Sequence, residues 1–211
     1  MVAVCNFQSS PDAGAIIAQR CDAVEASLAA MDAAARIAAL ADGRSLHADL
    51  FHGLAPAAYP DAAGLWRGTP GSSISGAPRA VFLARRLPGV RYRDLCLPAD
   101  QVAAEMAKLA DRMGQVWQEC PGRNDPWRDA AFQALADLTA GFFAIHPFMD
   151  GNGHVWRLSL PFLAARLGLE RRAEWTVHRR PYGPTFSLAL QWHGDHPSLL
   201  AQELRRWFRP D

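Results

Sequence analysis

The chain has 211 residues and a formal net charge of +1; half of its residues are hydrophobic and 20% are charged. This length predicts one domain, and the apolar content is enough for a packed core, which excludes intrinsic disorder and a small disulfide-stapled module. The 22 basic residues are balanced by 21 acidic ones, whereas a nucleic-acid binder that works by bulk charge would be more basic. We therefore expect no nucleic-acid partner.

The sequence shows no sign of secretion or membrane insertion. Its first residues lack the charged start and apolar run of a secretory signal, and no stretch of about 18 uncharged apolar residues predicts a membrane span. The four cysteines, Cys5, Cys21, Cys96 and Cys120, have no C-x-x-C spacing. We expect free, mostly buried thiols in a reducing compartment, with a disulfide or a metal site as the alternative. These features predict a cytoplasmic protein without a membrane partner.

Helical patterns begin near the N-terminus. Residues 11–41 are predicted to form one long helix or two short ones, because apolar side chains recur every three or four positions from Ile17 to Met31. A short helix over 44–53 follows. The next stretch, 53–78, is rich in proline and glycine and is predicted to be a long loop, which in a compact domain is usually functional or mobile.

The middle of the chain carries a predicted β-hairpin. Residues 79–83 and 90–97 have extended character, and Pro88-Gly89 between them is a turn signal. Such a hairpin needs support from the helices around it. Further helices predicted from apolar spacing cover residues 99–118, 127–145, 152–168, 184–193 and 197–208. The sequence thus predicts a mostly α domain with one β-hairpin.

The segment richest in chemically active side chains is 146–157, between two predicted helices, which reads His-Pro-Phe-Met-Asp-Gly-Asn-Gly-His-Val-Trp-Arg. Its Gly-Asn-Gly turn leads into a helix whose first N–H groups favour an anion such as a phosphate. Asp150 suits a hard cation such as Mg²⁺ that bridges phosphate oxygens. Arg157 can reach a more distal phosphate, and His146 can accept a proton near neutral pH. Together these groups describe a nucleotide-phosphate cradle beside a base.

This segment resembles the signature of the Fic family, His-x-Phe-x-(Asp or Glu)-Gly-Asn-Gly-Arg-x-x-Arg, and a motif of this length is specific. The matching residues are His146, Phe148, Asp150, Gly151, Asn152, Gly153 and Arg157. Residues 46–51 and 63–67 are similar, more weakly, to the family's early helix and to its Ala-Gly-x-aromatic-Arg stretch. The likeness covers about 44–208 and implies a Fic-like helical bundle. We therefore divide the chain into an N-terminal helical extension, 1–43, and a Fic-like catalytic domain, 44–211.

The resemblance implies that the protein moves a nucleoside monophosphate, most often AMP from ATP, onto a Ser, Thr or Tyr hydroxyl of a target protein. His146 would take the hydroxyl proton, and Asp150 would hold Mg²⁺ on the α- and β-phosphates. Residues 151–153 would bind phosphates, largely through backbone N–H groups and the asparagine amide. Arg157 would pair with the terminal phosphate, and Phe148 would be a buried anchor of the loop.

The resemblance also implies how a target is held and which group is transferred. The predicted hairpin lies where the family places its target-binding flap, so we expect residues 79–97 to align the target as an added strand. Gly153 stands where the family's phosphate-transferring Doc branch carries lysine. This position favours nucleotidyl transfer over phosphorylation of the target.

Many family members carry an inhibitory helix with the pattern Ser/Thr-x-x-x-Glu-Gly/Asn, and no such pattern is found here, since Glu25 is followed by Ala26. Either a separate antitoxin chain acts as the inhibitor, or the enzyme is not held off in this way. The Ala- and Arg-rich, Lys-poor composition suggests a bacterial source. A bacterial toxin, an effector delivered into a host or target cell, and a housekeeping regulator all stay open.

The main departure from the signature is His154, which stands where the family has its first arginine. Imidazole offers one hydrogen-bond donor when neutral and two when charged, against five for arginine, which predicts a retuned phosphate site. In the other interpretation His154 faces solvent or the core, and Arg179 or Arg180 replaces it. Three functions stay open: AMP transfer, transfer from another donor such as UTP, GTP or CDP-choline, and a non-catalytic Fic-fold binding module.

Overall fold

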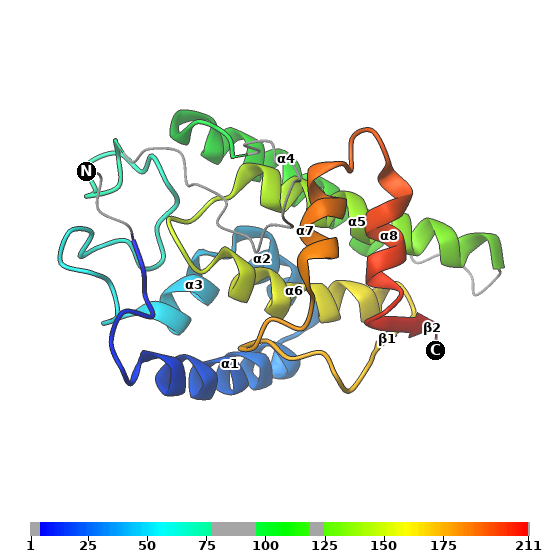
Figure 1. The fold of residues 1–211 in the computed structure, drawn as a ribbon, viewed down its shortest axis with the longest axis horizontal. Helices are drawn as coiled ribbons and strands as arrows, with labels where there is room; N and C mark the ends of the chain where they lie inside the picture. Colours follow the sequence, from blue (N-terminus) through cyan, green and yellow to red (C-terminus); the bar gives the residue numbers. More distant parts are fainter. Residues whose placement is uncertain (1–4, 77–95, 119–124, 211) are drawn as a thin grey trace.

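The computed structural model describes residues 5–76, 96–118 and 125–210, without the side chains of 125–127. Helices dominate this part of the chain, and a short two-stranded sheet accompanies them (Figure 1). The mostly α class predicted from the sequence is therefore confirmed. The hairpin predicted at 79–97 falls almost entirely outside the described residues.

The predicted helices have counterparts in the structure whose bounds differ from the predicted ones by a few residues. In chain order the elements are α1 Ala13–Ala30, α2 Ala33–Asp42, α3 Arg44–Phe51, the 3₁₀ helix η1 Ala99–Gln101, α4 Val102–Gln118, α5 Asp125–Ile145, α6 Asn152–Arg166, β1 Leu169–Arg171, α7 Pro184–Gln191, α8 Pro197–Leu204 and β2 Phe208–Pro210. The loop predicted at 53–78 contains turns and bends as far as it is described.

The N-terminal region forms two helices rather than one. Asp32 interrupts the helical run with extended backbone, and its side chain accepts a hydrogen bond from the N–H of Ala35 at 2.8 Å, which caps α2. Gly43, at φ = 68°, ends α2 and precedes α3. The apolar stripe of α1 from Ile17 to Leu28 is buried as predicted, and α1 and α2 pack against α3 and α4 respectively.

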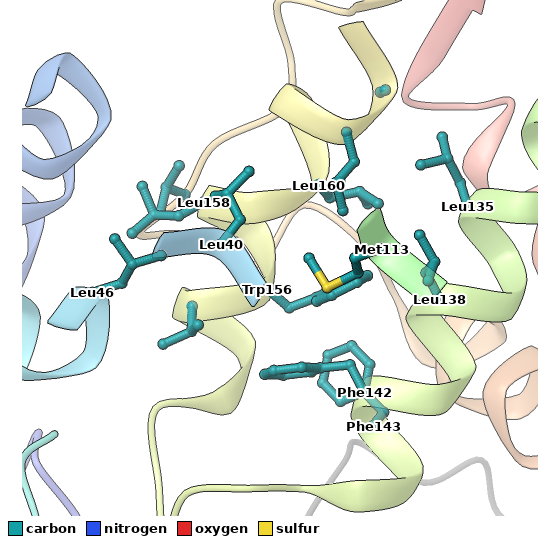
Figure 2. Close-up of a cluster of buried hydrophobic side chains, with 14 of the residues drawn as sticks. Leu40, Leu46, Met113, Leu135, Leu138, Phe142, Phe143, Trp156, Leu158 and Leu160 are labelled. Carbon is teal, nitrogen blue, oxygen red and sulfur yellow. The ribbon is translucent and has the colours of Figure 1, made fainter. Parts of the chain in front are cut away.

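Helix α6 lies inside the molecule, with α1 on one side and α5 on the other (Figure 1). Its residues are buried around most of its circumference, which is the pattern of a core helix. Leu158 points toward Leu40 of α2, while Trp156 faces α5 (Figure 2). The Trp156 ring stacks on Phe142 at 4.8 Å, and its Nε1 donates to Thr139 at 3.1 Å. The helix that begins at the Gly-Asn-Gly turn is thus held firmly from several directions.

A proline within α6 ties the following loop to the helix. Pro161 has no N–H, so the carbonyl oxygen of Arg157, four residues earlier, loses its helical donor. The indole Nε1 of Trp175 donates to that oxygen at 3.3 Å instead. Trp175 is buried and belongs to the connection between β1 and α7. This connection, residues 172–183, is therefore anchored beside the middle of α6.

The two short strands were not predicted. β1 pairs antiparallel with β2, with Leu169 opposite Pro210. The prediction of helix through residue 208 was wrong at its end, because α8 stops at Leu204 and β2 begins at Phe208. Strands of three residues are too short to show an alternation of apolar and polar side chains, so they could not be predicted from the sequence pattern.

The described cysteines match their prediction. Cys5, Cys21 and Cys96 are free and buried, whereas Cys120 lies outside the described residues. Burial raises the pKa of the Cys5 and Cys21 thiols to about 12, so both are uncharged. In the described part of the chain, no helix combines the length and the apolar character that crossing a membrane requires.

Candidate active site

The candidate site is built on the loop between α5 and α6, which begins with an unusual backbone conformation. His146 has φ = 50°, a left-handed geometry that non-glycine residues adopt only when their surroundings enforce it. Arg67, which is 1% exposed, supplies that support. Its Nε donates to the carbonyl oxygen of His146 at 2.7 Å, and its Nη2 donates to those of Ile145 at 2.8 Å and Leu97 at 3.0 Å. The cation also lies at the C-terminus of α5, where the helix dipole favours positive charge.

The imidazole of His146, the candidate base, is buried beside a cation. Burial, and after it the positive charge of Arg67, lowers the pKa of His146 to about 4. The ring is therefore neutral at physiological pH, as a general base must be. A polyphosphate bound nearby would raise this pKa through its negative charge, and would bring the imidazole closer to the basicity that proton transfer requires.

The other end of the loop is closed by Asn152. Its Oδ1 accepts from the N–H of Phe148 at 2.9 Å, and its Nδ2 donates to the carbonyl oxygen of Phe148 at 2.8 Å. Phe148 is completely buried. Both ends of the asparagine amide are engaged within the loop. Phosphate binding through this side chain, which the resemblance implied, would require those bonds to open, so the backbone N–H groups of the first turn of α6 are the better donors.

His47 on α3 supports the middle of the loop. Its Nδ1 accepts a hydrogen bond from the N–H of Gly64 at 2.8 Å, so its Nε2 carries the proton and donates to the carbonyl oxygen of Asp150 at 3.0 Å. The ring stacks on Phe148 at 4.0 Å. Burial lowers the pKa of His47 to about 4, which matches a neutral ring that must accept on one side and donate on the other.

Gly151 is required for close packing at the start of α6. Its φ is 78°, and a Cβ atom placed there would lie 2.3 Å from the ring of Phe51 and 3.1 Å from Nε2 of His47. Any side chain would therefore both strain the backbone and collide with α3. Gly151 lets the loop pack directly against α3, and this contact fixes the direction of the first turn of α6.

The carboxylate of Asp150 is covered by the N-terminal segment. The backbone N–H of Phe7 donates to its Oδ2 at 3.1 Å, and the Phe7 ring stacks on Phe51 at 4.7 Å. Burial raises the pKa of Asp150, and hydrogen bonds from the N–H groups of Phe7 and Gly151 oppose the rise. The side chain expected to hold a cation is therefore partly desolvated and already accepts two backbone donors.

The donor set suits a magnesium ion that arrives with its nucleotide. Within the described residues, no group of three or more His, Cys, Asp or Glu side chains could hold a metal ion. Mg²⁺ commonly binds through one or two carboxylates together with substrate phosphates and water. Asp150 could fill this role as a single protein ligand, and Mg²⁺ binding there would then depend on the phosphates.

Arg157 extends the site along α6. It is 5% exposed; its Nε donates to the carbonyl oxygen of Val177 at 2.5 Å, and its Nη2 donates to that of His178 at 3.4 Å. Nη1 lies 3.5 Å from the hydroxyl of Tyr182. The two Nη contacts are long, so these nitrogens retain capacity to bind an anion. A Cβ atom at Gly153 would lie 2.8 Å from Nη1, so a longer side chain there would press on the guanidinium.

His154 lies on α6 near Arg157. Its side chain is 7% exposed, and its ring centroid lies 5.6 Å from that of His178 and 5.6 Å from that of Phe51. Burial, with smaller effects from Arg157, His178 and His47, lowers the pKa of His154 to about 3. Of the two placements that the alternative interpretation allowed, solvent or core, His154 has the buried one; whether it takes part in phosphate binding stays a prediction.

Arg179 and Arg180, the two arginines considered as replacements for the motif arginine, are both exposed, whereas His154 is buried. Arg180 lies over the ring of Tyr182 at 5.0 Å and contacts the hydroxyl of Ser187 at 3.4 Å. The group beside His154 is instead the neighbouring imidazole of His178.

The structure brings the predicted residues of segment 146–157 together and adds four that the motif did not contain. Arg67 and His47 belong to stretches already noted for their weaker resemblance, which was the signal available. Phe7 and His178 carried no signal, because each reaches the loop from a part of the chain outside every motif.

Comparisons with known proteins show the family to which the chain belongs. The model of the Fic/DOC family matches residues 38–164, so the chain belongs to the Fic/DOC family. Members of this family generally transfer nucleotidyl or phosphate groups. No curated protein sequence matches the chain significantly.

Solved structures show the same fold. The BepC protein, a VirB-translocated effector from Bartonella tribocorum crystallised with AMPPNP, is 14% identical, with a TM-score of 0.60 over 94% of this chain and 85% of that one. The N-terminal Fic domain of a VirB-translocated Bep effector from Bartonella quintana, crystallised with ADP, is 17% identical, with a TM-score of 0.56 over 92% of this chain and 86% of that one. A second structure of a Bartonella quintana Fic domain is 18% identical, with a TM-score of 0.55 over 92% and 83%.

Proposed function

We propose that the chain is a protein adenylyltransferase that moves AMP from Mg-ATP onto a Ser, Thr or Tyr hydroxyl of a target protein. The observation that carries this proposal is the neutral His146, held in strained geometry by Arg67 at the start of the loop that leads to the N-terminus of α6. A base and a phosphate cradle on one short, rigid loop suit an in-line attack on a phosphate.

The chain's residues divide the reaction between them. The hydroxyl oxygen of the target attacks the α-phosphorus, the bond to the β-phosphate breaks, pyrophosphate leaves, and the hydroxyl proton passes to His146. The N–H groups of Asn152 and Gly153 face the phosphates from the first turn of α6. Arg157 binds the far end of the polyphosphate. Asp150 holds Mg²⁺, which neutralises charge on the phosphate oxygens when it is bound.

Two observations support ATP as the donor and AMP as the group transferred. The similar Bartonella structures were crystallised with AMPPNP and with ADP, both adenine nucleotides. Gly153 stands close to Nη1 of Arg157, and a lysine there, as in the Doc branch, would crowd that nitrogen. With glycine at position 153, Nη1 of Arg157 stays accessible to the terminal phosphates of a nucleotide, as the proposal requires.

A label-transfer assay tests the proposal. Each nucleoside triphosphate, labelled at the α- or at the γ-phosphate, is incubated with Mg²⁺, the protein and a cell lysate, with His146→Ala as the control. We expect label only from α-labelled ATP, and its loss in the control. Label only from the γ-position would replace the proposal with target phosphorylation, and label from another base would change the donor.

A non-catalytic binding module is the second candidate, favoured by the histidine in place of the first motif arginine. His154→Arg separates the two: transfer that appears only in the variant supports the module, whereas transfer by the natural chain supports the enzyme. Docking of the target on residues 79–97, inhibition by a separate antitoxin chain, and action as a toxin or a delivered effector stay predictions.

A further inference from the structure

Two buried imidazole nitrogens belong to rings that lie near Arg157. Nε2 of His154 and Nδ1 of His178 are shielded from solvent and have no hydrogen-bond partner among the residues that the structure describes. A buried polar atom without a partner loses the hydrogen bonds that water would give it, so native proteins seldom keep one without a reason. The two rings lie 5.6 Å apart between centroids, and together they leave two unsatisfied nitrogens beside one guanidinium.

The position of His178 is fixed by the same helix that carries His154. The Trp175 indole donates to the carbonyl oxygen of Arg157, and the Arg157 side chain donates to the carbonyl oxygens of Val177 and His178. The connection 172–183 is thus joined to α6 at both the backbone and the side chain of one residue. This arrangement holds the His178 ring beside His154 rather than leaving it on an exposed loop.

The charges around the pair favour an anion. Arg157 and Arg179 both lower the pKa of His178, after burial, while only Asp22 of α1 raises it. The charges of Arg157, His178 and His47 lower the pKa of His154, whereas a hydrogen bond with the backbone of His178 raises it. Among the described residues, no carboxylate lies within 4.0 Å of Arg157. Arg157 and Arg179 are cations and His178 becomes one when it is protonated, whereas Asp22 is the carboxylate that opposes them.

We propose that His154 and His178 form a two-imidazole subsite for the terminal phosphate of the donor, in which His178 supplies the hydrogen bond that the missing motif arginine would give. This inference rests on the proposed function and names the part of that site that selects a triphosphate over a diphosphate. A phosphate there would satisfy both orphaned nitrogens and would share the Nη groups of Arg157.

The subsite couples phosphate binding to proton uptake. His178 is half-buried and His154 is buried, so His178 takes up the proton more easily when a phosphate arrives. Binding of a triphosphate therefore tightens as the pH falls toward about 6, whereas an arginine in the same place would show no such dependence because it stays charged.

Calorimetric titration with Mg-ATP and Mg-ADP at about pH 6 and about pH 8 tests the subsite. We expect the natural chain to bind ATP more tightly at the lower pH, and His178→Ala to weaken ATP binding there about tenfold with little change for ADP. His178→Gln should keep the affinity measured at the higher pH and lose the increase. The titration of the nucleotide itself cancels when variant and natural chain are compared.

Two further variants sharpen the test. His154→Arg in the His178→Ala background should restore ATP binding and make it independent of pH. His196→Ala, at an exposed histidine that precedes α8, is the matched control and should leave both affinities unchanged.

Equal affinities of His178→Ala and the natural chain for ATP at both pH values would overturn the subsite, whatever the transfer assay shows. ATP binding that depends on pH and on His178, without any transfer of label, would support the subsite and overturn the adenylyltransferase.

Discussion

The two sides of the phosphate cradle differ in which side chains hydrogen bonds within the protein hold in place. On the loop side, Asn152 closes on Phe148, His47 bridges Gly64 and Asp150, and each of these bonds lies within the protein. On the α6 side, two imidazole nitrogens are buried without a partner in the described chain. This contrast supports the proposal that a ligand completes the α6 side, whereas bonds within the protein hold the loop.

The largest expected effect is the loss of transfer rate when the candidate base, His146, is replaced. His146→Ala should reduce the rate of transfer by roughly a thousandfold, since general base catalysis contributes about 10²–10⁴, while the affinity for Mg-ATP stays within about twofold. Rapid-quench measurement of label transfer, beside calorimetric binding, checks both quantities. Retention of the full rate would mean that another group takes the hydroxyl proton.

The scaffold's close packing predicts a large loss of stability at Gly151. Gly151→Ala should lower the free energy of unfolding by about 3 kcal/mol, because it adds backbone strain and a collision with the Phe51 ring. Gly53→Ala is the matched control: Gly53 has φ = 72° with no atom within 4 Å of the added Cβ, so it reports the backbone cost alone. Denaturant unfolding gives both values, and equal losses would show that α3 yields to the added methyl group.

Because His47 is buried in its neutral form, we expect the stability of the protein to depend on pH. His47 has a pKa of about 4 in the folded protein against 6.5 ordinarily, so the unfolded chain binds its proton first as the pH falls. Its contribution, about 3 kcal/mol, is fully present above pH 6.5 and is lost between about 6.5 and 4. Asp150, whose pKa is raised, has the opposite sign, being stabilising only below its folded pKa.

Unfolding of His47→Gln measured across this range isolates the histidine. The variant should be less stable than the natural chain at neutral pH and should lose part of the acid slope. His52→Gln, at an exposed histidine that follows α3, is the control. An acid slope unchanged in His47→Gln would show that His47 is not the group responsible.

The site residues that lie close together in the sequence could be predicted, and those that come from distant segments could not. The helices followed from apolar spacing, and segment 146–157 supplied the candidate base, carboxylate and arginine because one short stretch carries them all. Arg67 and His178 come from distant parts of the chain, and only folding brings them to α5 and α6. The unsatisfied nitrogen of His154 could not be inferred either, since hydrogen bonding depends on which neighbours the fold supplies.

The smallest effect concerns the support of His146 by Arg67. Arg67→Met removes the cation that lowers the pKa of His146, so that pKa should rise and the acid limb of the pH–rate profile for transfer should move to higher pH. The shift is smaller than the whole depression, because burial is the larger cause. Arg67→Lys keeps the charge but loses the fork that binds three carbonyl oxygens. It should slow transfer with less movement of the acid limb. If both variants moved the limb equally, geometry rather than charge would set the pKa of His146, and the scaffold would act on the base through position alone.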